Sequence, residues 1–262
     1  MRRRRIGLIG FGYIGETVYR RIAKSPDLDV AFVYARDPRK LTDVPWSVVL
    51  EDLDDFATRE PDLVVEMAHP GITRRYGEAF LRRTNYMMLS VTALADAALE
   101  ARLRATAAEA GTTLYLPHGA LVGCDSLFEW REHWAEVTIT FRKHPRNIDF
   151  SESGIDPATI VGATTVYDGP VRGIAQLFPR NVNTMATCAL ATVGLDRCRG
   201  VLVADPSLDV AIAEVVAVGR DGSRLETVKR QPAIGVSGTE MLESQYHSIL
   251  LAAGSHGPLA FV

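Results

Sequence analysis

Short aliphatic runs alternate with longer segments of helical period over the first 117 residues. The runs are bounded by turn or charged residues, and they occupy residues 5–10, 29–35, 63–68, 86–91 and 112–117. Short, continuous apolar runs of this kind predict strands buried on both faces of a parallel sheet. The segments with helical spacing lie between them, at residues 13–24, 72–83 and 95–110. This order predicts βα units wound on both sides of one sheet.

The pattern changes after residue 117, where polar and β-branched residues alternate along several runs. These runs are residues 135–142, 164–169, 200–204 and 209–219. Asp221-Gly222 then marks a hairpin turn, and residues 173–196 and 239–253 have helical spacing. We therefore expect two domains: residues 1–117 with the parallel sheet, and residues 118–262, an α+β domain with a mainly antiparallel sheet and a C-terminal helix.

Composition restricts the class of protein. The chain has 262 residues, of which 47% are hydrophobic and 23% charged, so it has ample material for a core. The formal net charge of -3 argues against general binding to nucleic acid or to an anionic membrane. The apolar runs are all too short for a membrane helix. Three scattered cysteines indicate neither a disulfide framework nor a zinc site, and a reducing cytoplasm is the expected location.

A glycine-rich sequence, GFGYIG, follows the first strand at residues 10–15 and opens the first helix. In this position Gly10 permits a tight turn, Gly12 lets the backbone approach a pyrophosphate, and Gly15 lets helix and strand pack closely. The amides around Tyr13 and Ile14, at the helix N-terminus, face the anion. The first domain is therefore predicted to be a Rossmann dinucleotide-binding domain, with a fortuitous glycine-rich turn as the alternative.

The end of the second strand bears on the choice of nicotinamide cofactor. An acidic residue there would bind the ribose 2′-hydroxyl of NAD, but Ala35 stands at that position and Arg36 follows it. Because arginine pairs with phosphate, Arg36 favours NADP. Asp37 keeps NAD open, and Arg36 as a solvated turn residue is the alternative.

Several segments together resemble the L-aspartate dehydrogenase family, and the resemblance covers nearly the whole chain. The segments are LSVTALAD at residues 89–96, PHGA at 117–120, RKHP at 142–145, LFPRNVN at 177–183 and VADP at 203–206. The resemblance implies a Rossmann-type amino-acid dehydrogenase with a second α+β domain, in which Ala120 and Asn183 contact the cofactor. An amide such as that of Asn183 can bond the nicotinamide carboxamide as donor and acceptor, although a helix N-cap is the alternative role.

The carboxyl ends of the third and fourth strands supply further candidate cofactor contacts, because open α/β sheets bind ligands at that edge. These candidates are Ala68, His69, Ser90 and Thr92.

Two departures from the family pattern put aspartate itself in doubt as the substrate. The family carries an Asn-x-His after the VADP segment, whose histidine is the proposed catalytic residue; here Ala211 and Ala213 take those places. The family's Asn-Pro-Lys-Thr-Ser loop is represented only by VSGTE at residues 236–240. A methyl group cannot accept a proton, so another group must do this work if the chain is an enzyme.

His118 is the first candidate for that work, because it follows the fifth strand at the ligand-binding edge and its ordinary pKa is near neutrality. Asp205 is the carboxylate that best matches the family. A solvent-facing loop histidine and an Asp-Pro turn are the respective alternatives. Cys124 invites comparison with thiol catalysis, but a small buried apolar residue is the simpler interpretation.

Arg142, Lys143 and Asn181 are the predicted substrate-binding residues, because cations and amides bind carboxylates. Arg142 and Lys143 at a wet sheet edge are the alternative. The spacing of histidines and cysteines predicts no metal site.

The sequence thus predicts an NAD(P)-dependent oxidoreductase that transfers hydride between nicotinamide and a small amino, imino or oxo acid. A non-catalytic NAD(P)-binding sensor or scaffold is the alternative, and the missing histidine favours it. A sugar dehydrogenase is a weaker alternative, because Ser90-Val91-Thr92 stands where such enzymes carry Glu-Lys-Pro. The second sheet is expected to pair in a homodimer.

Overall fold

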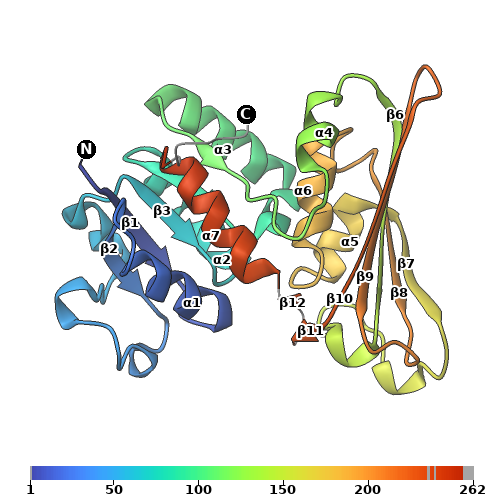
Figure 1. Ribbon diagram of the computed structural model, residues 1–262, viewed down its shortest axis with the longest axis horizontal. Coiled ribbons are helices and arrows are strands. Elements are labelled where there is room, and N and C mark those ends of the chain that lie inside the picture. Colours follow the sequence, from blue (N-terminus) through green and yellow to red (C-terminus); the bar gives the residue numbers. More distant parts are fainter. Residues whose placement is uncertain (1, 235–236, 239, 256–262) are drawn as a thin grey trace. The chain divides into compact units, whose positions relative to one another are not determined.

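The computed structural model describes residues 2–234, 237–238 and 240–255. The chain divides into two compact units (Figure 1). The first unit comprises the described residues within 1–90, 96–117 and 242–262, and the second comprises those within 91–95 and 118–241.

The first unit contains a five-stranded sheet in the order β2-β1-β3-β4-β5. Its strands are β1 (Arg4–Ile9), β2 (Leu28–Tyr34), β3 (Leu63–Glu66), β4 (Asn85–Met88) and β5 (Leu114–Tyr115). All neighbouring strands are parallel. The order steps outward from β1 in both directions, which confirms the predicted doubly wound sheet.

Helices cover both faces of this sheet. They are α1 (Tyr13–Ile22), α2 (Pro70–Leu81), α3 (Ala97–Ala110) and α7 (Met241–Ala252). Ile6 and Leu8 of β1 share one core with Val18 of α1 and Ile249 of α7. On the other face Tyr86 of β4 packs against α2, where its ring centroid lies 5.2 Å from that of Phe80.

Local sequence sets the ends of α3. The Asp96 carboxylate accepts hydrogen bonds from the N–H groups of Ala98 and Leu99, both at 3.0 Å, which caps the first turn. Gly111 ends the helix at a φ of 65°, a conformation that costs glycine little. The predicted start at residue 95 was therefore two residues early.

The second unit contains a mixed sheet in the order β10-β9-β6-β8-β7. Its strands are β6 (Trp134–Lys143), β7 (Thr164–Pro170), β8 (Arg199–Ala204), β9 (Ala211–Gly219) and β10 (Arg224–Gln231). Among the described strands of this sheet, β6 and β8 are the one parallel pair, and the other neighbouring strands are antiparallel. Gly222, at a φ of 85°, lies in the turn that joins β9 to β10, as the Asp-Gly pair predicts.

The described residues of this unit also form the helices α4 (Cys124–Glu129), α5 (Val171–Leu177) and α6 (Asn183–Ala191). Figure 1 shows them on one side of the sheet. A Cβ atom at Gly200 of β8 would lie 3.2 Å from Ile174 of α5 and 3.6 Å from Met185 of α6, so the lack of a side chain there lets both helices approach the sheet. The single helix predicted over residues 173–196 is wrong. Pro179 lacks an N–H and disfavours the helical conformation of Phe178 before it, so the chain turns between α5 and α6.

Shorter elements complete the described chain. The 3-10 helices are η1 (Pro38–Lys40), η2 (Trp46–Val48), η3 (Leu53–Arg59), η4 (Val91–Ala95), η5 (Pro145–Asn147) and η6 (Pro157–Thr159), and β11 (Ala233–Ile234) pairs with β12 (Ser237–Gly238).

The C-terminal helix α7 belongs by its contacts to the first unit, whereas the sequence analysis assigns it to the domain of residues 118–262. Its Ile249 and Ala253 are buried in the core that β1 and α1 form. This position follows from the apolar surface of α7, which the β1 face of the sheet can cover.

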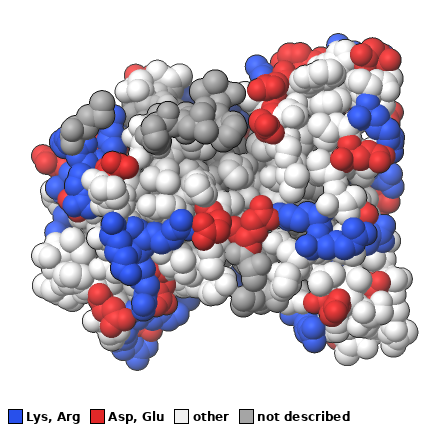
Figure 2. All heavy atoms as spheres, in the orientation of Figure 1, with Lys and Arg blue, Asp and Glu red and all other residues white. Residues whose placement is uncertain are grey.

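Within the described part of the chain, no helix has both the length and the apolar character to span a membrane. Figure 2 shows basic and acidic side chains beside one another on the visible face, in keeping with 29 Lys and Arg residues against 32 Asp and Glu residues.

Candidate active site

The glycine-rich loop of the first unit has the geometry that a dinucleotide cradle requires. Gly10 has a φ of 102°, and a Cβ atom there would lie 2.7 Å from the carbonyl oxygen of Met67. A Cβ atom at Gly15 would lie 2.1 Å from the carbonyl oxygen of Gly10. A Cβ atom at Gly12 would meet nothing within 4 Å. The first and third glycines are therefore needed by the fold, while the second leaves an open surface for a ligand.

Gly12 is also the N-cap of α1, and no side chain bonds to this end of the helix. The first intrahelical bond runs from the N–H of Glu16 to the carbonyl of Gly12 at 2.9 Å. The N–H groups of Tyr13, Ile14 and Gly15 precede that bond, so they are placed to receive an anion.

After β2, the Asp37 carboxylate is hydrogen-bonded within the turn that it begins. It accepts hydrogen bonds from Arg39 at its backbone N–H (3.2 Å), Nε (2.8 Å) and Nη2 (3.1 Å). The Arg39 side chain lowers the pKa of Asp37. Arg36 is exposed beside it.

A buried carboxylate organises the loops that follow β3 and β4. Glu66 accepts hydrogen bonds from the N–H groups of Ala68 and His69, both at 2.7 Å, and from the Oγ of Ser90 at 2.9 Å. Burial raises the pKa of Glu66, and these donors oppose the shift. Three predicted cofactor residues are thus gathered around one side chain that the sequence analysis missed. The available signal was an acidic residue inside an apolar strand.

His69 has a second structural role, because its Nδ1 accepts a hydrogen bond from the N–H of Gly71 at 3.0 Å and caps α2.

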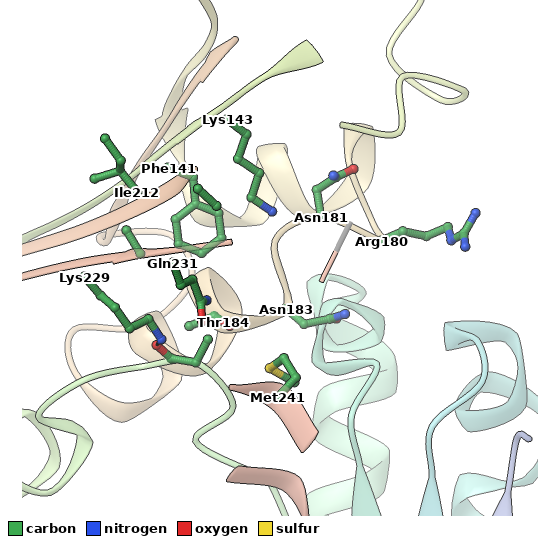
Figure 3. Close-up of a pocket in the computed structure, with 13 residues that line it drawn as sticks. Phe141, Lys143, Arg180, Asn181, Asn183, Thr184, Ile212, Lys229, Gln231 and Met241 are labelled. Carbon is green, nitrogen blue, oxygen red and sulfur yellow. Dashed lines mark hydrogen bonds between the residues drawn. The ribbon is translucent and has the colours of Figure 1, made fainter. Parts of the chain in front are cut away.

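The second unit contains a pocket on the inner face of its sheet, at one end of β6, β9 and β10 (Figure 3). Strand register places Ala213 of β9 directly between Phe141 of β6 and Lys229 of β10. The pocket is lined by Ala120, Phe141, Lys143, Arg180, Asn181, Asn183, Thr184, Ala211, Ile212, Ala213, Lys229, Gln231 and Met241. Its volume of about 80 Å³ is several times what one water molecule needs, ~10–15 Å³.

Lys143 is the most buried cation of this pocket, with 8% of its surface exposed. Its Nζ lies 5.1 Å from the centroid of the Phe141 ring, and Figure 3 shows the side chain reaching from β6 into the pocket. Burial lowers the pKa of Lys143 to about 8.

Lys229 and Arg180 are further cations of the pocket, and both contact carboxylates. Lys229 donates hydrogen bonds to the Glu240 carboxylate and to the carbonyl oxygen of Ala120. Arg180 donates from Nη1 to Asp149 at 2.9 Å.

Two asparagines at the N-terminal end of α6 hydrogen-bond to neighbouring segments. The Oδ1 of Asn183 accepts hydrogen bonds from the N–H and the Oγ1 of Thr92, both at 3.1 Å, which ties η4 to the start of α6. The amide of Asn181 bonds to the carbonyl of Asn147 and to the N–H of Asp149, so it fixes the loop after β6. Asn183 is the first residue of α6 rather than its N-cap, which is Val182.

Arg142, Asp205 and His118 are predicted site residues that are not among the described residues lining the pocket. Arg142 faces the opposite side of the sheet from Lys143 and donates to Glu214 at 3.2 Å. Asp205 accepts hydrogen bonds from the N–H and Oγ of Ser207, and these lower its pKa. His118 begins the turn that brings Ala120 to the pocket.

The described residues contain no cluster of three or more His, Cys, Asp or Glu side chains suited to a metal. Burial raises the pKa of the Cys124 thiol, which disfavours a nucleophilic thiolate. Of the VSGTE segment, Val236 and Thr239 lie outside the described residues.

Comparison with known proteins agrees with this geometry in both units. Residues 129–242 match the family model described as "Aspartate dehydrogenase, C-terminal". Residues 10–117 match the model "Homoserine dehydrogenase, NAD binding domain". An "Aspartate dehydrogenase domain-containing protein" of Xenopus tropicalis is 37% identical over all of this chain and 98% of its own length. The chain belongs to the aspartate dehydrogenase family.

Further similar proteins include an L-aspartate dehydrogenase and a solved structure of an aspartate dehydrogenase. An L-aspartate dehydrogenase of Methanosarcina acetivorans is 32% identical over 87% of this chain and 89% of its own length. A crystal structure of aspartate dehydrogenase from Thermotoga maritima superposes with a TM-score of 0.77 at 25% identity, and the match covers 100% of both chains. The family resemblance and the α/β fold expected from the sequence are thereby confirmed, and the first unit is an NAD-binding domain.

Proposed function

We propose that this aspartate dehydrogenase family member is an active, NADP-preferring dehydrogenase that acts on a small carboxylated amino acid and on the corresponding 2-oxo acid. One observation carries the proposal: the family-matched pocket is lined by the cationic side chains of Lys143 and Arg180 and by the amide of Asn181. Cations and amides of this kind bind carboxylates.

The residues of the first unit fit a nicotinamide dinucleotide. Gly12 leaves open space where a pyrophosphate approaches, and the N–H groups at the start of α1 are available to it. When bound, the nicotinamide supplies the group that accepts or donates hydride. Within this unit the remaining predicted contacts are Arg36, Ala68, His69 and Ser90, whereas the predicted contacts Thr92, Ala120 and Asn183 belong to the second unit. Glu66 acts indirectly, because it fixes the backbone of Ala68, His69 and Ser90.

The end of β2 supports NADP over NAD. The Asp37 carboxylate is already held by Arg39, so it is less available to a ribose 2′-hydroxyl. Arg36, Arg39 and Lys40 form a basic turn around it, and arginine donors pair well with a 2′-phosphate.

The pocket of the second unit supports an anionic substrate of small size. Its lining combines the basic side chains of Lys143 and Arg180 with the apolar side chains of Phe141, Ala211 and Ala213. We propose that Ala213 occupies the position of the family's catalytic histidine, so the acid–base chemistry of this chain differs from the family pattern.

The methyl groups of Ala211 and Ala213 also favour the second candidate function, a protein that binds NAD(P) without turnover. Both functions require the cofactor cradle, so cofactor binding cannot distinguish them. Turnover of a substrate can distinguish them, because only the dehydrogenase consumes the cofactor.

The experiment has two stages on the purified protein. Fluorescence titration gives the dissociation constants of NADPH and NADH, with Gly12→Ala as the control variant that should lose binding. NADPH consumption is then followed with ammonia and oxaloacetate, pyruvate or 2-oxoglutarate. The proposal expects tighter binding of NADPH and turnover of at least one acid. Tight binding with no turnover of any acid would support the non-catalytic alternative.

A further inference from the structure

The last residue of β3, Glu66, is a fully buried carboxylate of the first unit. Its Oε1 accepts hydrogen bonds from the N–H groups of Ala68 and His69, both at 2.7 Å, and from the Oγ of Ser90 at 2.9 Å. Its Oε2 accepts a further bond from the N–H of Ser90 at 3.1 Å. Within the described part of the chain, the donors to this carboxylate are therefore backbone N–H groups and one hydroxyl from the loops after β3 and β4.

Both oxygens of Glu66 must act as acceptors in this arrangement. A backbone N–H can donate a hydrogen bond but cannot accept one, and each oxygen faces at least one such group. These donors offset the cost of burying the carboxylate. A glutamine side chain of the same size presents an NH2 group in place of one oxygen, so at least one buried N–H group would lose its acceptor.

The loops that Glu66 holds lie against the glycine-rich turn. Strand register places Glu66 beside Ile9 of β1 and Met88 of β4, and the N–H of Met67 donates to the carbonyl of Ile9 at 2.8 Å. A Cβ atom at Gly10 would lie 2.7 Å from the carbonyl oxygen of Met67, so the backbones of the turn and of the loop after β3 are in contact. The turn and the loops after β3 and β4 are thus contiguous at the carboxyl edge of the sheet.

The order of the strands sets the course of a dinucleotide along this edge. In the proposed function, the pyrophosphate lies at the N-terminus of α1, where Gly12 leaves open space, and the basic turn after β2 receives the adenosine ribose. The order is β2-β1-β3-β4-β5, so β2 lies on one side of β1 while β3 and β4 lie on the other. The nicotinamide half therefore extends over the loops that Glu66 joins.

We propose that Glu66 is a positioning residue that holds the loops after β3 and β4 as one preformed surface for the nicotinamide half of the cofactor. This inference rests on the cofactor binding of the proposed function and not on turnover. Because Glu66 is fully buried, it acts through the backbone of Ala68, His69 and Ser90 rather than by contact with the cofactor. His69 extends this effect to α2, whose first turn it caps through the N–H of Gly71 at 3.0 Å.

The competing explanation is a purely structural role, in which Glu66 stabilises the first unit as a whole. The two roles differ in which part of the cofactor responds to substitution. Loss of a merely structural residue weakens binding of both halves, because both depend on the folded sheet. Loss of a residue that positions the nicotinamide surface weakens binding of the whole cofactor but spares a fragment that lacks the nicotinamide half.

The first measurement compares whole cofactors with such fragments by isothermal titration calorimetry. NADPH is paired with 2′,5′-ADP and NADH with ADP, so the preferred cofactor has its own fragment whichever it is. Glu66→Gln should weaken the preferred cofactor by about 10-fold or more and its fragment by less than about 2-fold, since a buried N–H without an acceptor is costly and lies under the nicotinamide half. Glu109→Gln, at an exposed position of α3, is the matched control and should behave as wild type.

The second measurement uses the wild-type protein, so it does not depend on the folding of a variant. Ala68 and His69 are exposed residues, yet their N–H groups donate to a buried carboxylate. Hydrogen exchange followed by NMR without cofactor should therefore show the N–H groups of Ala68, His69 and Ser90 to be protected. Exchange of these groups at the rate of exposed loops would overturn the proposal, because the surface would not be preformed.

The calorimetric results can also overturn the proposal. Unchanged affinity of Glu66→Gln for the preferred cofactor would show that the loops need no buried carboxylate to bind it. Equal weakening of cofactor and fragment would leave Glu66 with a structural role alone. Absence of NADPH and NADH binding to wild type would remove the proposed function and this inference together. The expected difference between cofactor and fragment, found in a protein without turnover, would support the role of Glu66 and remove the proposed activity.

Discussion

At the scale of single residues, Lys143 couples the pocket to the stability of the fold. Its folded pKa of about 8 lies below the ordinary 10.5, so the folded state disfavours the charged form. Below pH 8 both folded and unfolded chains carry the proton, and folding bears the full cost of burying the charge. As pH rises towards 10.5 only the unfolded chain keeps the proton, so the folded state gains stability.

Replacement by methionine should remove this pH dependence. The free energy of unfolding of wild type, measured relative to Lys143→Met, should rise by about 2–3 kcal/mol between about pH 7 and pH 10. Urea unfolding of both proteins at several pH values measures the difference. A difference that stays constant with pH would show that Lys143 is not a buried, destabilised cation.

Arg36 is the residue that decides between the two cofactors in this account. Its replacement by alanine should weaken NADPH binding by roughly 10–100-fold, since a hydrogen bond to a charged group contributes about 1.5–3 kcal/mol. NADH binding to the same variant is the internal control and should change little. Equal weakening of both cofactors in a fluorescence titration would argue against a 2′-phosphate contact.

At the scale of elements, the three glycines between β1 and α1 have separable roles. Gly12→Ala adds a methyl group where the fold has open space, so its melting temperature should remain close to that of wild type. NADPH affinity should nevertheless fall by 10-fold or more, because the methyl group occupies the pyrophosphate approach.

Gly15→Ala is the contrasting variant. Its Cβ would lie 2.1 Å from the carbonyl oxygen of Gly10, so it should lose both stability and cofactor binding. Unchanged NADPH affinity in Gly12→Ala would disprove the proposed position of the pyrophosphate.

The C-terminal helix α7 stabilises the first unit. Ile249 is fully buried in the core shared with β1, and Leu251 on the same helix is 55% exposed. Ile249→Ala should lower the free energy of unfolding by about 2–5 kcal/mol, and Leu251→Ala should have a much smaller effect. Thermal unfolding of the two variants, with and without NADPH, measures both losses of stability. Equal effects would contradict the packing of α7 in this core.

Pattern and turn chemistry predicted the elements well where one signal dominates. Uninterrupted apolar runs identified β1 to β4, and Gly111 marked the end of α3. The break between α5 and α6 was missed because the surrounding apolar spacing outweighed the single Pro179. Helix α4 was also missed, since its six residues are too few to show a helical period.

At the scale of the whole molecule, the sequence predicted the cofactor cradle better than the substrate pocket. The cradle depends on glycines that are close together in the chain. The pocket depends on strand register, which places Ala213 between Phe141 and Lys229. Sequence alone could not show which of two adjacent cations, Arg142 or Lys143, faces inward. Nor could it show that Glu66 gathers two loops, because that requires the order of β3 and β4 in the sheet.

Several expectations remain predictions at this scale. They are the homodimer, the cytoplasmic location, the division into domains of residues 1–117 and 118–262, and the catalytic roles of His118 and Asp205. The predicted contact between the pocket and a carboxylated substrate is the first expectation to test, because the other assignments of the active site depend on it.

The most direct test of the central claim is NADPH consumption by wild-type protein with ammonia and a graded series of 2-oxo acids. The series runs from dicarboxylates through monocarboxylates to their uncharged amides. The account predicts turnover of one or more of the acids, with the amides at least 10-fold poorer in kcat/KM because they present no negative charge to the basic side chains of the pocket. NADPH binding without turnover of any member, or equal turnover of acids and amides, would contradict it.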